Sequence, residues 1–328
     1  YYCTLAREVS NPGHLIFNFT NPSGIITQAL RSCGFANVYG ICDAPSGFIK
    51  QLEEILNVPY GALDIECYGL NHLSWFRNAK LDGRDVQEEL LNNPRTYQHS
   101  EMRLFTREMA RLSGECMLNE YLYFYYRREK SLSMVQKAEH PRGEMIYLIN
   151  RELETQLAQM ELPRDFEKAF NLYMNAYGKR ENAYFSVESG ACREKEPDEG
   201  GYAAVALRFI RAITDGEDCR MVLSVPNEGA IDGLEDDDVV EITCDIHSDG
   251  AHPIHIGVID EFQLQQIKRL KYFERCTIQA ILHDDRDSAV KGLALHPLVN
   301  DFELAETLSG IFFKEYASFI HMNEASGQ

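Results

Sequence analysis

The stretch 14–56 constrains the fold most, because it repeats one pattern twice. A short apolar run (14–18, then 37–41) is followed by turn residues and an amphipathic helical segment (25–33, then 48–56). Short apolar runs bounded by turn residues are typical of buried parallel strands. Parallel strands joined by a helix take a right-handed crossover, which places the loops at their carboxyl ends side by side. We therefore expect a βαβα unit with a ligand site at this edge.

The rest of the chain follows a different pattern. Strands are expected at 63–68, 220–225 and 239–245, with a hairpin or strand turn at 75–80 followed by Asp82-Gly83. Helices are expected at 101–112, 120–130, 142–160 and 201–214, and over most of the chain after 260. The predicted class is α/β. Residues 1–60 are expected to form the C-terminal part of a Rossmann-like doubly wound domain, and residues 61–328 a mixed α+β, largely helical domain.

Charge and cysteine content narrow the class of partner. The 328 residues include 32 Lys+Arg and 51 Asp+Glu, a net charge of −19. This acidity argues against nonspecific binding to nucleic acid or to an anionic membrane, since phosphate backbones need clustered cations. No apolar stretch reaches the roughly 18 residues of a membrane span. The nine cysteines are scattered without a CxxC motif, which favours a reducing compartment and a cytoplasmic location.

Two residues at strand ends could bind a metal together. Cys42 follows one expected strand and precedes a helix, whose amino end would favour the thiolate. His72 follows the expected strand 63–68. Taken singly, each is more often a structural residue. As a pair they would form a soft or borderline site with open positions for substrate oxygens, unlike a closed four-ligand site.

Three further features have both a functional and a structural interpretation. Asn21 could hydrogen-bond a sugar hydroxyl, or it could simply form a turn. The tyrosine-rich run 121–126 could supply a base only beside a cation or metal, because a free phenol has a pKa near 10; otherwise it is core. Arg142 could bind an anion at the start of a long helix, or lie on the surface.

The order of these motifs resembles one known family. They are Asn21-Pro22, Cys42-Asp43-Ala44-Pro45, Gly69-Leu70-Asn71-His72, Tyr121-Leu122 with the tyrosines after it, and Arg142-Gly143-Glu144, followed by 200–213, Val225-Pro226-Asn227 and Asp249-Gly250-Ala251. The ordered set resembles glycoside hydrolase family 4, the NAD- and divalent-metal-dependent glycosidases, and is most similar to its 6-phospho-β-glucosidase branch. The resemblance covers nearly the whole chain and implies a lactate/malate dehydrogenase-like architecture. It implies that residues 1–60 are the remainder of a Rossmann-like NAD-binding domain and that residues 61–328 form the domain that binds metal and substrate.

The resemblance implies redox-assisted elimination in place of two-carboxylate hydrolysis. In this reaction NAD⁺ oxidises C3 of the sugar, a tyrosinate removes the C2 proton, the aglycone leaves, and water adds before the hydride returns. Cys42 and His72 would hold Mn²⁺ or another divalent metal. Tyr121 would be the base, with Tyr125 and Tyr126 as rivals. The other implied site residues are Asp43 as proton donor and Asn21, Asn71 and Arg142 as substrate contacts.

The family's glycine-rich dinucleotide turn is not found in the sequence, so the NAD-binding residues are unknown and an N-terminal segment is expected to be missing.

Three alternatives to a 6-phospho-β-glucosidase stay open. Asp43 stands where many β-specific members have Asn, which also allows a 6-phospho-α-glucosidase or an α-galactosidase. A truncated, inactive paralogue that acts as a subunit or binding protein is another alternative, as is a non-glycosidase NAD-dependent dehydrogenase. The expected substrate is a phosphorylated disaccharide or glucoside, and the expected assembly a homodimer or homotetramer.

Overall fold

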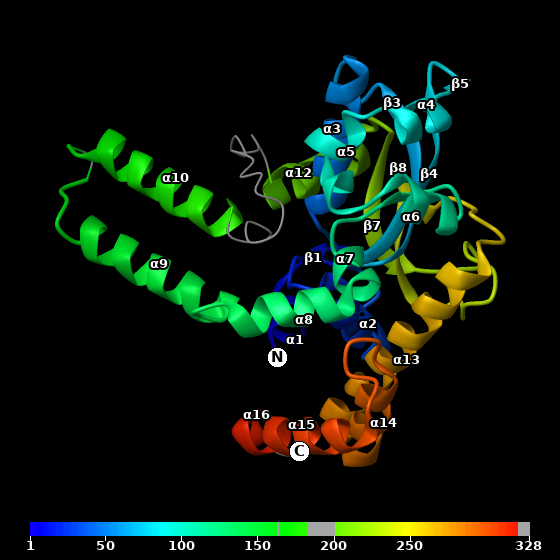
Figure 1. The fold of residues 1–328 in the computed structure, drawn as a ribbon. Coiled ribbons are helices and arrows are strands. Elements are labelled where there is room, and N and C mark those ends of the chain that lie inside the picture. Colours follow the sequence, from blue (N-terminus) through cyan, green and yellow to red (C-terminus); the bar gives the residue numbers. More distant parts are fainter. Residues whose placement is uncertain (163, 183–200, 321–328) are drawn as a thin grey trace. The chain divides into compact units, whose positions relative to one another are not determined.

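The computed structural model describes residues 1–162, 164–182 and 201–320, and it contains two β-sheets (Figure 1). The five-stranded sheet has the order β1-β2-β7-β8-β9. Its strands are β1 (Ile16–Asn18), β2 (Val38–Gly40), β7 (Cys219–Pro226), β8 (Val239–His247) and β9 (Gly250–Pro253). Only β1 and β2 are parallel, and the other pairs are antiparallel. The expected βαβα unit is therefore present but continues into C-terminal antiparallel strands.

The two expected crossover helices are α2 (Ser23–Ser32) and α3 (Ala44–Leu56). Asn18 pairs with Gly40 at the ends of β1 and β2, so the loops that follow lie side by side, as expected. Gly40 permits close packing at this point. A Cβ there would lie 2.6 Å from the Cβ of Ser224 and 2.7 Å from Oγ1 of Thr27.

The second sheet is an antiparallel meander with an added short strand. It contains β3 (Leu63–Leu70), β4 (Leu73–Leu81), β5 (Arg84–Asp85) and β6 (Met117–Leu118), with β6 paired to β4. The turn at Asp82-Gly83 is confirmed, with φ of 51° and 80°. A second, two-residue turn at Asn71-His72 joins β3 to β4. The Cys67 amide of β3 donates to Thr243 Oγ1 of β8 (2.8 Å), which ties the two sheets together.

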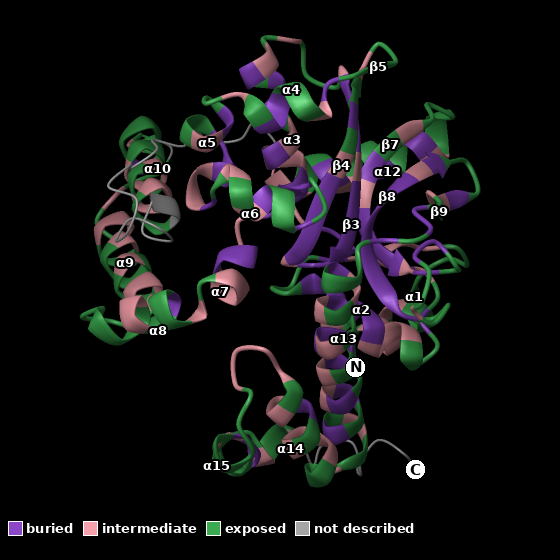
Figure 2. Cartoon of the chain, turned by 45° about the vertical axis from the view of Figure 1, so that its right-hand side comes forward, coloured by how far each residue is buried: buried purple, intermediate pink, exposed green. Residues whose placement is uncertain are grey.

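The core lies between these sheets and the helices on them, as the buried strands in Figure 2 show. Its largest fully buried side chains include Trp75, Tyr68, Phe48 and Phe76. The Phe48 and Phe76 rings meet edge to face with centroids 4.9 Å apart, which joins α3 to β4.

Outside residues 126–200, the remaining described helices are mostly short before residue 126 and longer after residue 200, except for a last helix of four residues. They are α1 (Tyr2–Val9), α4 (Gln87–Asn92), α5 (Thr96–His99), the 3₁₀ helix Glu101–Leu104, α6 (Arg107–Leu112), α7 (Leu122–Tyr126), α12 (Gly201–Asp215), α13 (Glu261–His283), α14 (Arg286–Leu295), α15 (Phe302–Glu315) and α16 (Ala317–Ile320). The expected helix at 101–112 is interrupted because Thr106 caps a new helix by accepting from the Met109 amide. The helical C-terminal region is confirmed.

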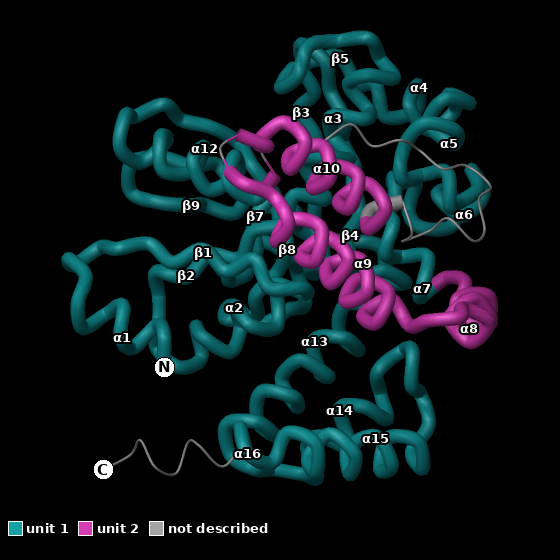
Figure 3. Tube along the Cα trace, turned by 90° about the vertical axis from the view of Figure 1, so that its left-hand side faces the viewer, with its two compact units in different colours: residues 1–125, 202–328 teal, residues 126–201 magenta. Residues whose placement is uncertain are grey.

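The chain forms two compact units, Tyr1–Tyr125 with Tyr202–Gln328, and Tyr126–Gly201 (Figure 3). These units do not follow the predicted boundary at residue 60, since 1–60 and 61–125 share unit 1. The functional division at that boundary stays a prediction. Gly200 of the motif 200–213 lies outside the described residues.

The residues of unit 2 that the structure describes form helices with largely exposed side chains. They are α8 (Arg128–Lys137), α9 (Arg142–Leu157) and α10 (Phe166–Asn182). The expected helix 120–130 is divided between α7 and α8, and the expected helix 142–160 ends at Leu157. Among the described helices, none is long and apolar enough to cross a membrane.

Candidate functional site

Asn71 contacts three segments that are distant from it in the sequence. Its Oδ1 accepts a hydrogen bond from the Ser23 amide at the start of α2 (2.7 Å), and its Nδ2 donates to Glu241 of β8 (2.8 Å). The Asn71 side chain also hydrogen-bonds the thiol of Cys42. The structure thus brings Cys42 and the Asn71-His72 turn together in unit 1. Both ends of the Asn71 amide contact protein, which gives this side chain a positioning role. Its contact with substrate stays a prediction.

His72 has a backbone conformation that is uncommon for non-glycine residues. Its φ is 68°, in the left-handed region where Gly and Asn are preferred, although His is also enriched there. Such positions persist where surrounding contacts hold them, and they cluster at functional sites. Burial lowers the pKa of His72 to about 4, so the ring is neutral at pH 7 and retains a lone pair for a metal.

Tyr121 lies directly against His72. Their rings stack with centroids 3.7 Å apart and an angle of 9° between the planes. The pairing of β6 with β4 brings Tyr121 to this position. Just after β6, the Asn119 amide donates to the Ser74 carbonyl of β4 (3.2 Å). Asn119 Oδ1 then accepts from the Tyr121 amide (2.9 Å), which fixes the start of the tyrosine-rich run.

The electrostatics of Cys42 differ from the expectation that a helix amino end favours its thiolate. Burial, together with the Glu241 carboxylate, raises the pKa of the Cys42 thiol far above its ordinary value, and this outweighs a hydrogen bond from the Ala44 amide. In the metal-free chain the thiol is protonated at neutral pH. Asp43, the next residue, is half-buried at the N-cap of α3.

The remaining predicted residues lie in different surroundings. Asn21 is exposed, in a cis peptide bond with Pro22 just before α2. Arg142 belongs to unit 2, where its Nη1 donates to the Arg180 carbonyl (3.1 Å). Tyr125 lies in unit 1, and burial together with Glu274 raises the pKa of its phenol. Tyr126 begins unit 2.

Two buried carboxylates of this region, Glu241 and Glu274, are absent from the predicted set. Glu241 accepts from Asn71 Nδ2 and from Ser74 Oγ (2.9 Å), and burial raises its pKa to about 7. A sequence signal existed, because Glu241 lies in a largely apolar strand (VVEITCDI) and a carboxylate is rarely fully buried without a partner. Glu274 on α13 gave no such signal, because charged residues are common in an amphipathic helix and most of them are exposed.

A closed structural metal site is not seen in the described ranges, where no group of three or more His, Cys, Asp or Glu side chains could hold an ion. The assignment of Cys42 and His72 as metal ligands stays a prediction.

The fold matches that of known phosphoglucosidases. A structure of the 6-phospho-β-glucosidase from Thermotoga maritima with manganese, NAD⁺ and glucose 6-phosphate superimposes with a TM-score of 0.75 at 26% identity, covering 97% of this chain and 69% of the other. This similarity confirms the predicted α/β class.

The sequence comparisons define the family. Residues 67–299 match the model of the family 4 glycosyl hydrolase C-terminal domain. The chain therefore belongs to the family 4 glycosyl hydrolases, which confirms the resemblance inferred from its motifs. It is 28% identical over 312 residues to 6-phospho-β-glucosidase BglT of Thermotoga maritima, with 94% of this chain and 67% of that protein aligned. It is also 24% identical over 276 residues to maltose-6′-phosphate glucosidase MalH of Clostridium acetobutylicum, which aligns 83% of this chain and 60% of that protein. The chain thus spans about two thirds of the length of such relatives.

Proposed function

We propose that this chain is the metal- and sugar-binding part of a 6-phospho-β-glucosidase that depends on NAD⁺ and Mn²⁺. The observation that carries the proposal is the meeting of Cys42, Asn71, His72 and Tyr121 through one hydrogen-bonded amide and one ring stack. The names of the relatives and the ligands of the Thermotoga structure support the substrate class.

The residues fit a divalent metal. His72 is neutral and able to donate its lone pair, and Cys42 would lose its proton on binding because a metal ion lowers the pKa of a coordinating thiol. When bound, NAD⁺ supplies the hydride acceptor for C3 of the sugar and the metal supplies a Lewis acid for the sugar oxygens. Asn71 and Glu241 hold the loop of His72 against that of Cys42.

Tyr121 is the proposed base that removes the C2 proton. Its ring stacks on His72, so a cation bound there would lower the pKa of the phenol. Tyr125 is the weaker candidate, because burial and the Glu274 carboxylate raise the pKa of its phenol and oppose the tyrosinate. Elimination of the aglycone, water addition and return of the hydride complete the proposed hydrolysis.

Asp43 is the proposed proton donor to the leaving group, and Asn21 and Arg142 are proposed substrate contacts. Asp43 also gives the second candidate function, a 6-phospho-α-glucosidase, because the resemblance associates Asp at this position with α-specific members. The similarity to a maltose-6′-phosphate glucosidase is in keeping with that candidate.

We propose a cytoplasmic homo-oligomer as the working form. The eight cysteines in the described ranges are all free thiols, as in a reducing compartment. Light scattering on the purified chain would distinguish a dimer or tetramer from a monomer.

The direct test is hydrolysis of nitrophenyl 6-phospho-β-glucoside and its α-anomer with Mn²⁺, NAD⁺ and a thiol reductant. We expect turnover of the β-anomer that is lost in EDTA and slowed by deuterium at C2 or C3. Faster turnover of the α-anomer would support the second candidate. Cleavage of neither substrate, in this chain or in one extended by the coding sequence upstream, would leave an inactive paralogue as the better description.

A further inference from the structure

Glu241 is a buried carboxylate that the protein holds with neutral groups. It lies in β8 and is only 2% exposed. Its Oε1 accepts from Asn71 Nδ2 (2.8 Å), and its Oε2 accepts from Ser74 Oγ (2.9 Å). In the part of the chain that the structure describes, no Lys, Arg or His forms an ion pair with this carboxylate. Because buried charges in proteins are usually paired, a carboxylate with neutral partners requires an explanation.

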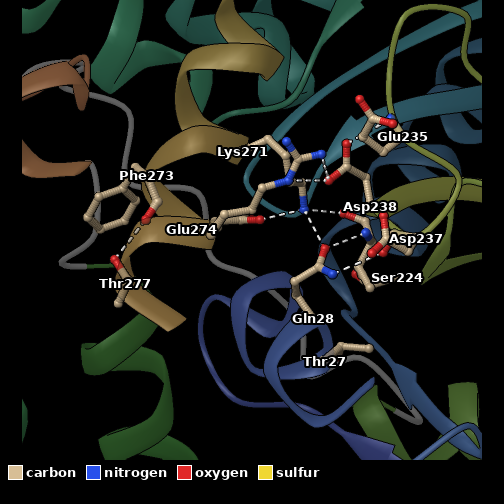
Figure 4. A network of polar contacts seen from close by, with 12 residues as sticks. Thr27, Gln28, Ser224, Glu235, Asp237, Asp238, Lys271, Phe273, Glu274 and Thr277 are labelled. Carbon is tan, nitrogen blue, oxygen red and sulfur yellow. Dashed lines mark hydrogen bonds and ion pairs between the residues drawn. The ribbon is translucent and has the colours of Figure 1, made fainter. Parts of the chain in front are cut away.

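Two other buried carboxylates of the same unit have the usual ionic partner. Glu274 of α13 pairs with Lys271 (2.5 Å), and Asp238 pairs with Arg275 (2.5 Å) (Figure 4). Asp238 directly precedes β8, the strand that carries Glu241. The fold thus places a cation beside a carboxylate at the start of this strand but not beside Glu241.

Glu241 contacts both segments that carry the predicted metal ligands. Asn71 precedes His72 in the turn, and Ser74 is the second residue of β4, so the two donors to Glu241 lie on either side of His72. The Asn71 side chain also hydrogen-bonds the thiol of Cys42. Burial and then the Glu241 carboxylate raise the pKa of that thiol, so the two groups are within electrostatic reach of each other.

The charges of these groups match those of a divalent cation. His72 is neutral, whereas a Cys42 thiolate and the Glu241 carboxylate would each carry one negative charge. Two buried anions close together repel each other, which contributes to the protonation of the thiol in the metal-free chain. With a divalent ion beside them the group would be neutral, and a buried site favours neutrality because an uncompensated charge is costly there.

We propose that Glu241 is a charge-balancing residue of the metal site. It acts through Asn71, because both of its oxygens already accept from protein donors, and together with the Cys42 thiolate it offsets the charge of a divalent cation. The inference rests on the proposed function for the ligands Cys42 and His72. It goes further by assigning a third residue that sets the affinity for the cation.

The test is Mn²⁺ binding to the chain at pH 7.5, measured by electron paramagnetic resonance. Glu241→Gln removes the charge but keeps the hydrogen bonds, since glutamine can accept from Asn71 and donate to Ser74 Oγ. This variant should raise the Kd for Mn²⁺ about ten- to a hundredfold, the usual effect of changing a group that supports a metal ligand. Glu53→Gln is the matched control, because Glu53 is equally buried but bonds backbone amides near the far end of α3. It should leave the Kd unchanged.

A second measurement separates loss of charge from loss of shape. In the metal-free chain, the Tyr121 ring stacks on His72 and shifts the NMR signals of the histidine ring protons. Histidine labelled with ¹³C at Cε1 would report these signals. They should stay in place in Glu241→Gln and move in Glu241→Met, which removes both hydrogen bonds. Ser74→Ala keeps the charge and removes one hydrogen bond, so it should weaken Mn²⁺ binding less than Glu241→Gln does.

Weaker Mn²⁺ binding in Glu241→Gln with unmoved His72 signals would support the proposal. Equal Mn²⁺ affinity in this variant and the wild type would overturn it, as would a loss accompanied by moved His72 signals, which would make Glu241 a structural residue. A chain that binds Mn²⁺ in a Glu241-dependent way but cleaves neither nitrophenyl glucoside would refute the proposed function and leave this inference standing. Cleavage with an unchanged Kd for Mn²⁺ in Glu241→Gln would do the opposite.

Discussion

At the scale of single residues, the site depends on side chains that the protein holds at some cost. Cys42 is kept protonated by burial, His72 adopts a left-handed backbone, and Glu241 is buried with a raised pKa. Perturbed groups of this kind gather at functional sites, although structural networks can also produce them. Each of these side chains therefore gives a measurable consequence.

Replacement of Cys42 by Ser should weaken Mn²⁺ binding by at least about tenfold, because a hydroxyl is a poorer ligand than a thiolate for this kind of site. Electron paramagnetic resonance of free Mn²⁺ would measure the change. Cys33→Ser is the control, since Cys33 is exposed and outside the site. Equal Mn²⁺ affinity in the Cys42 and Cys33 variants would remove Cys42 from the ligand set.

The buried carboxylate of Glu241 should make stability depend on pH. Burial raises its pKa to about 7, so the folded state binds a proton that the unfolded state releases at lower pH. The contribution of this group to the free energy of unfolding therefore falls as pH rises from about 4.5 to 7, by about 3 kcal/mol in total.

Glu241→Gln, which cannot ionise, should match wild type near pH 5 and become the more stable protein near pH 7.5. A glutamine can still accept from Asn71 and donate to Ser74 Oγ. Urea unfolding in EDTA measures the difference, with Glu306→Gln as the exposed control. A stability difference that stays constant with pH would show that Glu241 does not titrate in this range.

At the scale of helices and strands, close packing fixes how the C-terminal helices meet. Gly292 of α14 faces Cys276 of α13, where a Cβ would lie 2.7 Å from the Cβ of Cys276. This contact allows the two helices to approach without a side chain between them.

Gly292→Ala should lower the free energy of unfolding by about 1–3 kcal/mol, because the methyl overpacks this contact. Gly310→Ala in α15 is the matched control. It has no atom within 4 Å of the new methyl, and it should raise stability by about 0.5–1 kcal/mol through helix propensity. Denaturant midpoints would compare the two variants. Equal effects would show that α13 and α14 can separate to accept the methyl.

The sequence predicts local elements better than their partners. The repeat in 14–56 correctly predicts parallel β1 and β2, since periodicity and turn residues are local. It cannot predict that β2 pairs with β7, because Gly40 meets Ser224 only through tertiary contact. For the same reason, Cys42 and His72 could be proposed as site residues, because each follows a strand that the sequence predicts. Glu274 could not, because it lies on a helix and comes near Asn71 only through tertiary contact.

At the scale of the whole molecule, the net charge of −19 should affect how charged sugars bind. The negative electrostatic field of the protein opposes the binding of an anionic sugar phosphate but not that of a neutral sugar. Raising the ionic strength from 10 to 150 mM shortens the screening length from about 30 to about 8 Å.

We therefore expect the Kd for glucose 6-phosphate to fall over this range of salt, while that for glucose stays constant. Calorimetry at both salt concentrations would measure the two constants. A Kd for glucose 6-phosphate that rises with salt would instead show that local cations control binding of the phosphate.

The left-handed backbone of His72 has a consequence for the descent of this protein. A non-glycine residue in this conformation carries a cost of about 1–3 kcal/mol, which Gly would avoid and Asn would reduce. Where selection for catalysis is relaxed, mutation at this turn should drift toward Gly or Asn, because either would stabilise the hairpin. The residue at position 72 would then record, in any related lineage, whether the chain is still under selection as an enzyme.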